Sequence, residues 1–377
     1  MGTFALGIAE FLMMGILINL SQSLHVSVAS AGHLISAYAL GVCVGAPVLL
    51  FFRRMPLKSM AIMLAGVICA GNLLAAAAPG YATLFAARFL AGLPHGGYFG
   101  VGAIIARRLV PEGKRGTAVA YMISGMGLAT VVGVPLGTYI TGMLSWRAAF
   151  VLVGIWGALT MLCLYCFVPK IGTLPDTGFK GQFTFMRHAA PWLIAGGVFF
   201  GQMGIYCWYS YVDPIMTREA GFSPASLTWL MVLAGLGMFV GNLVGGRLGD
   251  RYKPSLVAAL MQAGGALVLL LIYFTVSVQW LSVVLMMCGT FALFAPGSPL
   301  QSSIIAYSKG GELLGAALVQ IAYNGANAGA AFIGGLVIDN GLGFRAIALA
   351  GIPWVAVGCT MLMILYRTRE RVSVSHR

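Results

Sequence analysis

Charged residues are scarce in this sequence. Asp, Glu, Lys and Arg together make up 8% of the 377 residues, and only 9 residues are acidic. Soluble globular domains carry about 25% charged residues, so these charges are too few to cover the surface of a water-soluble protein. Disordered chains need low hydrophobicity, whereas 60% of this chain is hydrophobic. The composition therefore excludes both classes.

Motifs of catalysis and metal binding are also missing. We find no P-loop pattern for a nucleotide, and the 5 histidines are scattered, so no metal site is readable. All 7 cysteines lie inside hydrophobic segments, where cysteine behaves as a small buried apolar residue. A membrane-embedded enzyme would need a nucleophile or metal cluster near one face. We therefore expect no metal, no cofactor and no enzymatic activity.

Long hydrophobic runs are what the sequence has instead. A helix needs about 20 apolar residues to span a bilayer, and each spanning segment must be helical because no water satisfies its backbone. The alternating ten-residue segments of a β-barrel do not occur. The sequence predicts an all-α membrane protein with twelve transmembrane helices at residues 2–22, 31–53, 57–78, 81–107, 117–144, 147–168, 191–212, 225–247, 254–277, 279–305, 312–338 and 344–366.

The basic residues gather on one side of these segments. Only Arg147, Arg218 and Arg345 fall on the opposite side, and Arg88 lies inside a segment. Cytoplasmic loops are enriched in Lys and Arg, so we expect both termini in the cytoplasm. The net charge of +13 then reflects topology and not nucleic-acid binding. The residues on the predicted cytoplasmic side are Arg53, Arg54, Lys58, Arg107, Arg108, Lys114, Arg115, Lys170, Lys180, Arg187, Arg247, Arg251, Lys253, Lys309, Arg367, Arg369, Arg371 and Arg377.

The two halves of the chain resemble each other. LSWRAAF from residue 144 parallels LGFRAIA from residue 342, and two further short matches occur at similar offsets. Internal repeats of this kind are typical of transporters with alternating access around a site near the membrane midplane. We predict two pseudo-symmetric six-helix halves, residues 1–168 and 191–377, joined by a cytoplasmic loop over 169–190.

Three polar residues lie at membrane depth in the first half. Charged side chains there are costly and are functional candidates by default. Glu10 lies about 14 Å into the first segment, at 1.5 Å per residue, which suits a protonatable group that faces a cavity. Arg88 and His95 are seven residues apart and share one face of the fourth segment. Each of the three also has a structural alternative, as a hydrogen-bonded or packed residue of the core.

Polar stripes run along two segments of the second half. A lipid-facing surface would not carry them, so we expect both stripes to face the interior, where they contact either the substrate or another helix. Asp213 ends the first stripe and offers a titratable position. The candidate residues of the substrate cavity, in addition to His95, are Gln202, Tyr206, Tyr209, Gln320, Tyr323, Asn324 and Asn327.

Several motifs, in the correct helix order, resemble the major facilitator superfamily. They are LFAARFLAGLPHG from residue 84, GVPLG from residue 133 and GRLGDRYK from residue 246. The chain is most similar to the twelve-helix drug:proton antiporter branch, and within it to an AraJ-like group of sugar-efflux transporters. The resemblance covers nearly the whole chain.

The resemblance implies roles for individual residues. Arg88 would take part in proton coupling. Gly133, Pro135 and Gly137 would shape a bend in the fifth segment that favours antiport, although Val134 separates the glycine from the proline. Asp250 and Arg251, in the motif that begins at Gly246, would form charge contacts at cytoplasmic helix ends and stabilise the outward-open state. In the corresponding loop of the first half, Arg54 occupies the aspartate position, so that loop cannot make the same contact.

These observations predict a proton-coupled exporter of a small organic solute, sugar-like or drug-like, in a bacterial inner membrane. The proton gradient would supply the energy, with Glu10, Arg88 and Asp213 as coupling residues. We expect a monomer in the lipid bilayer with a small-molecule substrate and no nucleic acid. One alternative is proton-coupled uptake of a sugar or nucleoside, and a remote alternative is a membrane-embedded enzyme.

Overall fold

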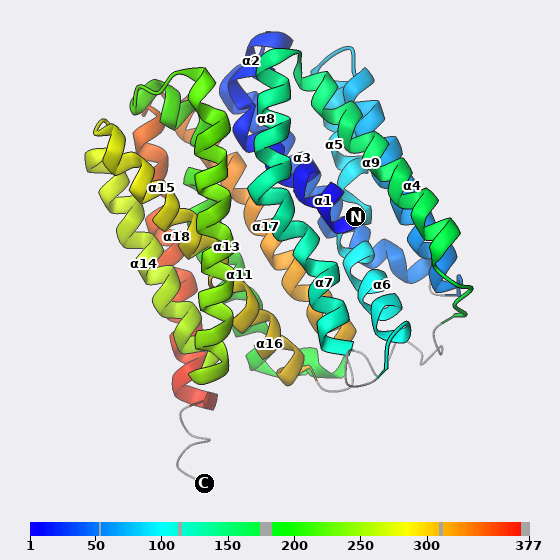
Figure 1. Cartoon of the computed structure of the whole chain (residues 1–377). Coiled ribbons are helices and arrows are strands. Elements are labelled where there is room, and N and C mark those ends of the chain that lie inside the picture. The colour runs from blue at the N-terminus through cyan, green and yellow to red at the C-terminus, as the bar shows by residue number, and fades with distance from the viewer. Residues whose placement is uncertain (53, 112–114, 174–182, 309–311, 371–377) are drawn as a thin grey trace. The chain divides into compact units, whose positions relative to one another are not determined.

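The structure is a computed structural model that describes residues 1–52, 54–111, 115–173, 183–308 and 312–370. Helices and turns, without strands, make up this part of the chain. The chain divides into two compact units, Met1–Thr177 and Gly178–Arg377. Figure 1 traces both from blue at the N-terminus to red at the C-terminus.

In its described residues, the first unit contains nine α-helices, two short 3₁₀ turns (η1 and η2) and one π turn (η4). In chain order they are α1 (Gly2–Phe11), η1 (Leu12–Gly15), α2 (Leu17–Leu24), α3 (Val28–Val48), η2 (Leu49–Phe52), α4 (Leu57–Ala77), α5 (Tyr81–Gly92), α6 (Pro94–Arg108), α7 (Arg115–Leu128), η4 (Ala129–Gly133), α8 (Val134–Met143) and α9 (Trp146–Phe167).

The second unit has the same composition of long helices and short connecting turns. In chain order they are η5 (Thr184–Arg187), α11 (Ala189–Tyr209), α12 (Val212–Pro214), η6 (Ile215–Glu219), η7 (Pro224–Ser226), α13 (Leu227–Arg251), α14 (Pro254–Thr275), α15 (Gln279–Phe294), α16 (Gly297–Tyr307), α17 (Glu312–Asp339), α18 (Phe344–Leu365) and η8 (Tyr366–Glu370).

The helices have the length and composition of membrane spans. Among the described residues, 11 helical stretches are long and apolar enough to cross a membrane, and the bent pair Gly2–Gly15 and Leu17–Leu24 makes a twelfth if it counts as one span. Large apolar side chains such as Ile155 and Leu162 of α9 are more than half exposed, as contact with lipid requires. The predicted all-α membrane fold is therefore confirmed.

Several spans that the sequence presents as continuous are interrupted, among them the first and the fifth. The first bends by 71° between Gly15 and Leu17, where Ile16 has a non-helical backbone (φ −131°, ψ 16°) after the 3₁₀ turn η1. In the fifth, the π-helical turn η4 ends at Gly133, two residues before Pro135. Proline has no N–H to donate to the preceding turn, and a π-turn is a common way to accommodate that loss.

Capping interactions fix several helix ends. Ser145 precedes α9, and its hydroxyl accepts a hydrogen bond of 3.3 Å from the Ala148 amide. At the start of α14, the amide and hydroxyl of Ser255 donate to Oε2 of Glu370, at 3.4 and 2.5 Å. The first amides of a helix have no partner within the helix, so the buried Glu370 carboxylate caps α14 from the far end of the unit's sequence.

Glycines allow the backbones of neighbouring helices to touch. Gly41 and Gly45 of α3 face the carbonyls of Phe89 and Leu93, and a side-chain carbon at either position would overlap those oxygens. In the second unit, Gly241 and Gly245 of α13 face the carbonyls of Phe291 and Ala295 in the same way. Close approach at small residues is a common mode of helix packing in membranes.

Candidate functional site

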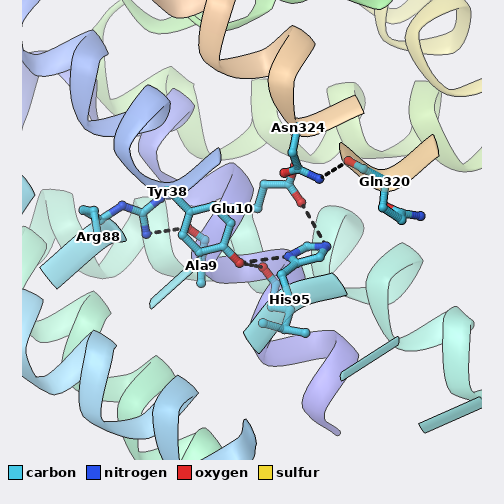
Figure 2. Close-up of polar contacts among 8 residues, drawn as sticks. Ala9, Glu10, Tyr38, Arg88, His95, Gln320 and Asn324 are labelled. Carbon is cyan, nitrogen blue, oxygen red and sulfur yellow. Dashed lines mark hydrogen bonds and ion pairs between the residues drawn. The ribbon is translucent and has the colours of Figure 1, made fainter. Parts of the chain in front are cut away.

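A cluster of four polar side chains lies inside the first unit. Glu10 comes from α1, Tyr38 from α3, Arg88 from α5 and His95 from α6. Their exposed fractions are 5%, 1%, 0% and 2%. Figure 2 shows them converging from these helices. The structure thus brings together Glu10, Arg88 and His95, which the sequence analysis selected separately.

Local packing places these residues. Gly92 ends α5, and a side-chain carbon there would overlap the carbonyl oxygen of Tyr38, so α3 and α5 touch at this level. Leu93 then leads into α6, which begins at Pro94. Arg88 and His95 therefore lie on either side of this junction, and both contact Tyr38.

Arg88 is held by α1 and by two aromatic rings. Its Nη1 donates a hydrogen bond of 2.7 Å to the backbone carbonyl of Ala9. Its guanidinium carbon lies 4.5 Å from the centre of the Tyr38 ring and 5.6 Å from that of Phe150. A desolvated cation over an aromatic face gains about 2 kcal/mol, which offsets part of the cost of burial. The Nε and Nη2 atoms have no hydrogen-bond partner among the described residues.

Tyr38, His95 and Glu10 form a chain of polar contacts. The Tyr38 hydroxyl lies 3.0 Å from Nδ1 of His95 and 3.5 Å from the carbonyl oxygen of Leu6. Nε2 of His95 lies 3.8 Å from Oε2 of Glu10 (Figure 2), which is an ion-pair separation and longer than a hydrogen bond. Phe99 stacks on the imidazole, with ring centres 5.3 Å apart.

The glycine-proline motif packs against the helix that carries Glu10. A side-chain carbon at Gly133 would lie 2.5 Å from Cγ1 of Ile8, and one at Gly137 would lie 2.7 Å from Cδ1 of Leu12. Both glycines and Pro135 are buried. The motif therefore lets η4 and α8 approach α1 closely.

The predicted stripe on the seventh span is only partly continuous. Gln202, Tyr206 and Tyr209 are buried on α11. Asp213 is also buried, but it lies on α12, after a turn at Ser210 and Tyr211 that interrupts the helix. The sequence interpretation of four residues on one helical face is wrong for Asp213, because α11 ends at Tyr209. Asp213 belongs to the second unit, whereas Glu10 and Arg88 belong to the first.

Amide side chains on α17 accompany those on α11. Nδ2 of Asn324 donates to the carbonyl of Gln320 at 3.0 Å (Figure 2), and Asn327 is 1% exposed. The two helices lie side by side, since a side-chain carbon at Gly329 of α17 would lie 2.9 Å from the sulfur of Met203 in α11. Just after α11, the Tyr211 hydroxyl donates to the Ala331 carbonyl at 2.7 Å. Among the described residues no hydrogen bond reaches the side-chain amides of Gln202 and Asn327, the Tyr323 hydroxyl or Oδ1 of Asn324.

The loop motif lies at the end of α13. Gly246 faces Ser298 of α16, since a side-chain carbon on the glycine would lie 3.4 Å from the serine Oγ. The guanidinium of Arg251 lies 5.6 Å from the ring centre of Tyr252. The side chain of Asp250 lies outside the part of the chain that the structure describes. A search of the described residues finds no group of three His, Cys, Asp or Glu that could hold a metal ion.

Tyr38 is the member of the cluster that the sequence analysis did not single out. It carries no charge and lies in an apolar segment, where an aromatic residue is usually a packing residue. One available signal was the set of small residues at 41 and 45 on its own helix, because small residues spaced by four mark close helix contacts. That spacing indicates a tight interface next to Tyr38 but does not identify its partners.

Sequence comparisons identify relatives over nearly the whole length. The chain is 39% identical to AraJ of Escherichia coli (strain K12) over 373 residues, which cover 98% of this chain and 95% of that protein. It is 31% identical to the inner membrane transport protein YdhP of the same strain over 371 residues, covering 98% and 95%.

Solved structures share the fold. A bacterial homologue of the human lysosomal transporter Spinster, in an inward-facing and unoccupied conformation, matches with a TM-score of 0.74 at 16% identity, covering 98% of this chain and 96% of that one. The family model of the Major Facilitator Superfamily matches residues 1–212 and again residues 194–377. The chain therefore belongs to the Major Facilitator Superfamily of membrane transporters.

Proposed function

We propose that this transporter exports a small organic solute, sugar-like or drug-like, by alternating access in exchange for protons. It acts as a monomer in the inner membrane of a bacterium, with both termini in the cytoplasm. The proton gradient supplies the energy, with no cofactor. Inward proton movement is favoured by about 2.3 kcal/mol per charge for each 100 mV of membrane potential.

The burial of Glu10 beside His95 and Arg88 is the observation that supports proton coupling most strongly. The carboxyl group is 5% exposed and 3.8 Å from an imidazole, and the residue before it accepts a hydrogen bond from Arg88. A proton that binds Glu10 changes the charge of this cluster. Arg88 responds to that change of charge, and its hydrogen bond to the Ala9 carbonyl carries the response to the backbone of α1. The glycine-proline motif packs against the same helix. Asp213 is a second titratable group, in the other unit.

The solute is proposed to contact the amides and tyrosines of α11 and α17. Buried polar groups need hydrogen-bond partners, and Gln202, Tyr323 and Asn327 have donors and acceptors that no described residue uses. An amide can both donate and accept, which matches hydroxyl and carbonyl groups of an uncharged organic solute. His95, Tyr206, Tyr209, Gln320 and Asn324 complete the proposed set.

A two-step experiment tests this function. Thermal-shift measurements on the purified protein with sugars, nucleosides and antibiotics identify a ligand, because ligands stabilise the folded state by mass action. The ligand, radiolabelled, is then offered to energised everted vesicles and to intact cells. Accumulation in everted vesicles that collapses with a protonophore is the expected result. Accumulation in intact cells instead would establish the uptake alternative, and the same distribution without the transporter would refute both.

A further inference from the structure

We propose that Tyr38 is a positioning residue that makes His95 change tautomer when Glu10 takes up a proton. This inference rests on the proposed role of Glu10 as a proton carrier. It adds the rearrangement of hydrogen bonds that accompanies proton uptake. It stands on three contacts: Tyr38 hydroxyl to His95 Nδ1, Tyr38 hydroxyl to the Leu6 carbonyl, and His95 Nε2 to Glu10.

The Tyr38 hydroxyl has one hydrogen and two acceptors within reach. It can donate to Nδ1 of His95 at 3.0 Å or to the carbonyl of Leu6 at 3.5 Å, but not to both. When it donates to Leu6, its oxygen is free to accept from His95. The hydroxyl can therefore partner either tautomer of a neutral imidazole.

The first arrangement suits an ionised Glu10. Tyr38 donates to Nδ1, so His95 carries its hydrogen on Nε2, and that N–H points at the carboxylate. A lone pair in the same place would repel the carboxylate.

The second arrangement suits a protonated Glu10. Its carboxyl O–H needs an acceptor, which is Nε2 of His95 once the imidazole hydrogen is on Nδ1 and the 3.8 Å separation shortens to hydrogen-bond length. Nδ1–H then donates to the Tyr38 oxygen, and Tyr38 donates to the Leu6 carbonyl. The second arrangement contains one proton more than the first. The hydrogen on Nε2 passes to Glu10, Tyr38 passes its hydrogen to Nδ1, and the incoming proton restores the Tyr38 hydroxyl, so that the net gain of the cluster is the proton on the carboxyl group. His95 stays neutral in both, which avoids burying a second positive charge near Arg88.

The charge around His95 comes from the cluster itself. The charged and titratable groups around it are Glu10 from α1, Tyr38 from α3 and Arg88 from α5. Phe99 of its own helix stacks on its ring. Of the helices that also pack against α6, α4 carries Lys58, which donates to the Tyr165 carbonyl, and α7 carries Tyr121, which is largely exposed. Arg88 lies over the Tyr38 ring, a contact that does not need the hydroxyl.

Two spectroscopic signals on the full-length protein test the inference. In protein labelled with ¹⁵N-histidine, the ring shifts of His95, assigned by subtraction with His95→Gln, report its tautomer. The infrared carboxyl band of Glu10, assigned with Glu10→Gln, reports its protonation. In the wild type we expect the His95 pattern to change from Nε2–H to Nδ1–H with the same midpoint as the Glu10 band.

The variant Tyr38→Phe keeps the ring under Arg88 and removes the hydroxyl. We expect its Glu10 band still to titrate while His95 loses the tautomer change. Tyr98→Phe, at a buried tyrosine of α6 outside the cluster, should behave as the wild type. The inference is overturned by a wild-type His95 that keeps one tautomer, by an imidazolium pattern, or by a Tyr38→Phe protein that still switches. A Glu10 band that does not respond to pH overturns the proton-carrier role as well.

Discussion

Arg88 donates its 2.7 Å hydrogen bond to the carbonyl of Ala9, the residue immediately before Glu10. The arginine therefore holds the backbone of α1 next to the acid and is not in the direct ion pair that their charges suggest. In this arrangement the arginine influences Glu10 through position as well as through charge.

We expect Arg88→Ala to impair proton coupling strongly. A hydrogen bond to a charged group contributes about 1.5–3 kcal/mol, so its loss should reduce proton-driven transport by about tenfold or more. Proton flux in proteoliposomes with a pH-sensitive dye measures this. Arg147→Ala is the control, because Arg147 also donates to a backbone carbonyl, that of Ala78 at 3.0 Å, but lies outside the cluster. Unchanged flux in Arg88→Ala would contradict a coupling role.

Glu10→Gln should remove the pH dependence of transport while leaving the protein folded in the membrane. The amide has nearly the same shape as the carboxyl group but cannot exchange a proton, and a neutral side chain lowers the cost of burial. Transport rates at several external pH values give the result. The exposed acid Asp339 provides the control variant Asp339→Asn. A wild-type pH profile in Glu10→Gln would rule out Glu10 as the carrier.

Two buried glutamines of the second unit should respond differently to substitution. Gln262 donates a 2.9 Å hydrogen bond to the Gly197 carbonyl, whereas no described residue bonds to the Gln202 amide; both are 0% exposed. Gln262→Leu should cost about 0.5–1.5 kcal/mol by removing this hydrogen bond. Gln202→Leu should leave the melting temperature unchanged or higher and eliminate stabilisation by the ligand. Retained stabilisation would remove Gln202 from the binding site.

Gly92→Ala should destabilise the first unit. The added carbon overlaps the Tyr38 carbonyl, which is backbone and cannot rotate away, and overpacking costs about 1–3 kcal/mol. Gly100→Ala, on the same span, meets nothing within 4 Å and should be neutral or slightly stabilising, because alanine favours helices. Melting temperatures of the two purified variants make the comparison. Equal melting temperatures would show that α3 and α5 separate at little cost.

Hydropathy and charge predicted the spans because the bilayer restricts the alternatives. Expected and observed segment ends agree to within about four residues, as for 225–247 and Leu227–Arg251. The interruptions at Ile16 and Tyr209 were missed, because they preserve the hydrophobic pattern and change only backbone angles. Pro135 and Pro214 were visible signals near two of the breaks, but a proline does not specify which turn forms.

Sequence reasoning found the charged members of the cluster because charge at membrane depth is rare. It could not find their connections. Arg88 pairs with a backbone carbonyl, which every residue carries, and Tyr38 meets His95 only because α3 and α5 touch at Gly92. Contacts of this kind depend on helix rotation and depth, which a single sequence does not encode in any residue type.

The carboxylate of Glu370 on the N-terminus of α14 has a practical consequence for handling the protein. A chain cut before this residue would leave the Ser255 amide and hydroxyl without the acceptor they use now. Affinity tags, fluorescent fusions and protease sites therefore belong beyond residue 370, and a truncation that looks like trimming a tail would in fact weaken the ninth span.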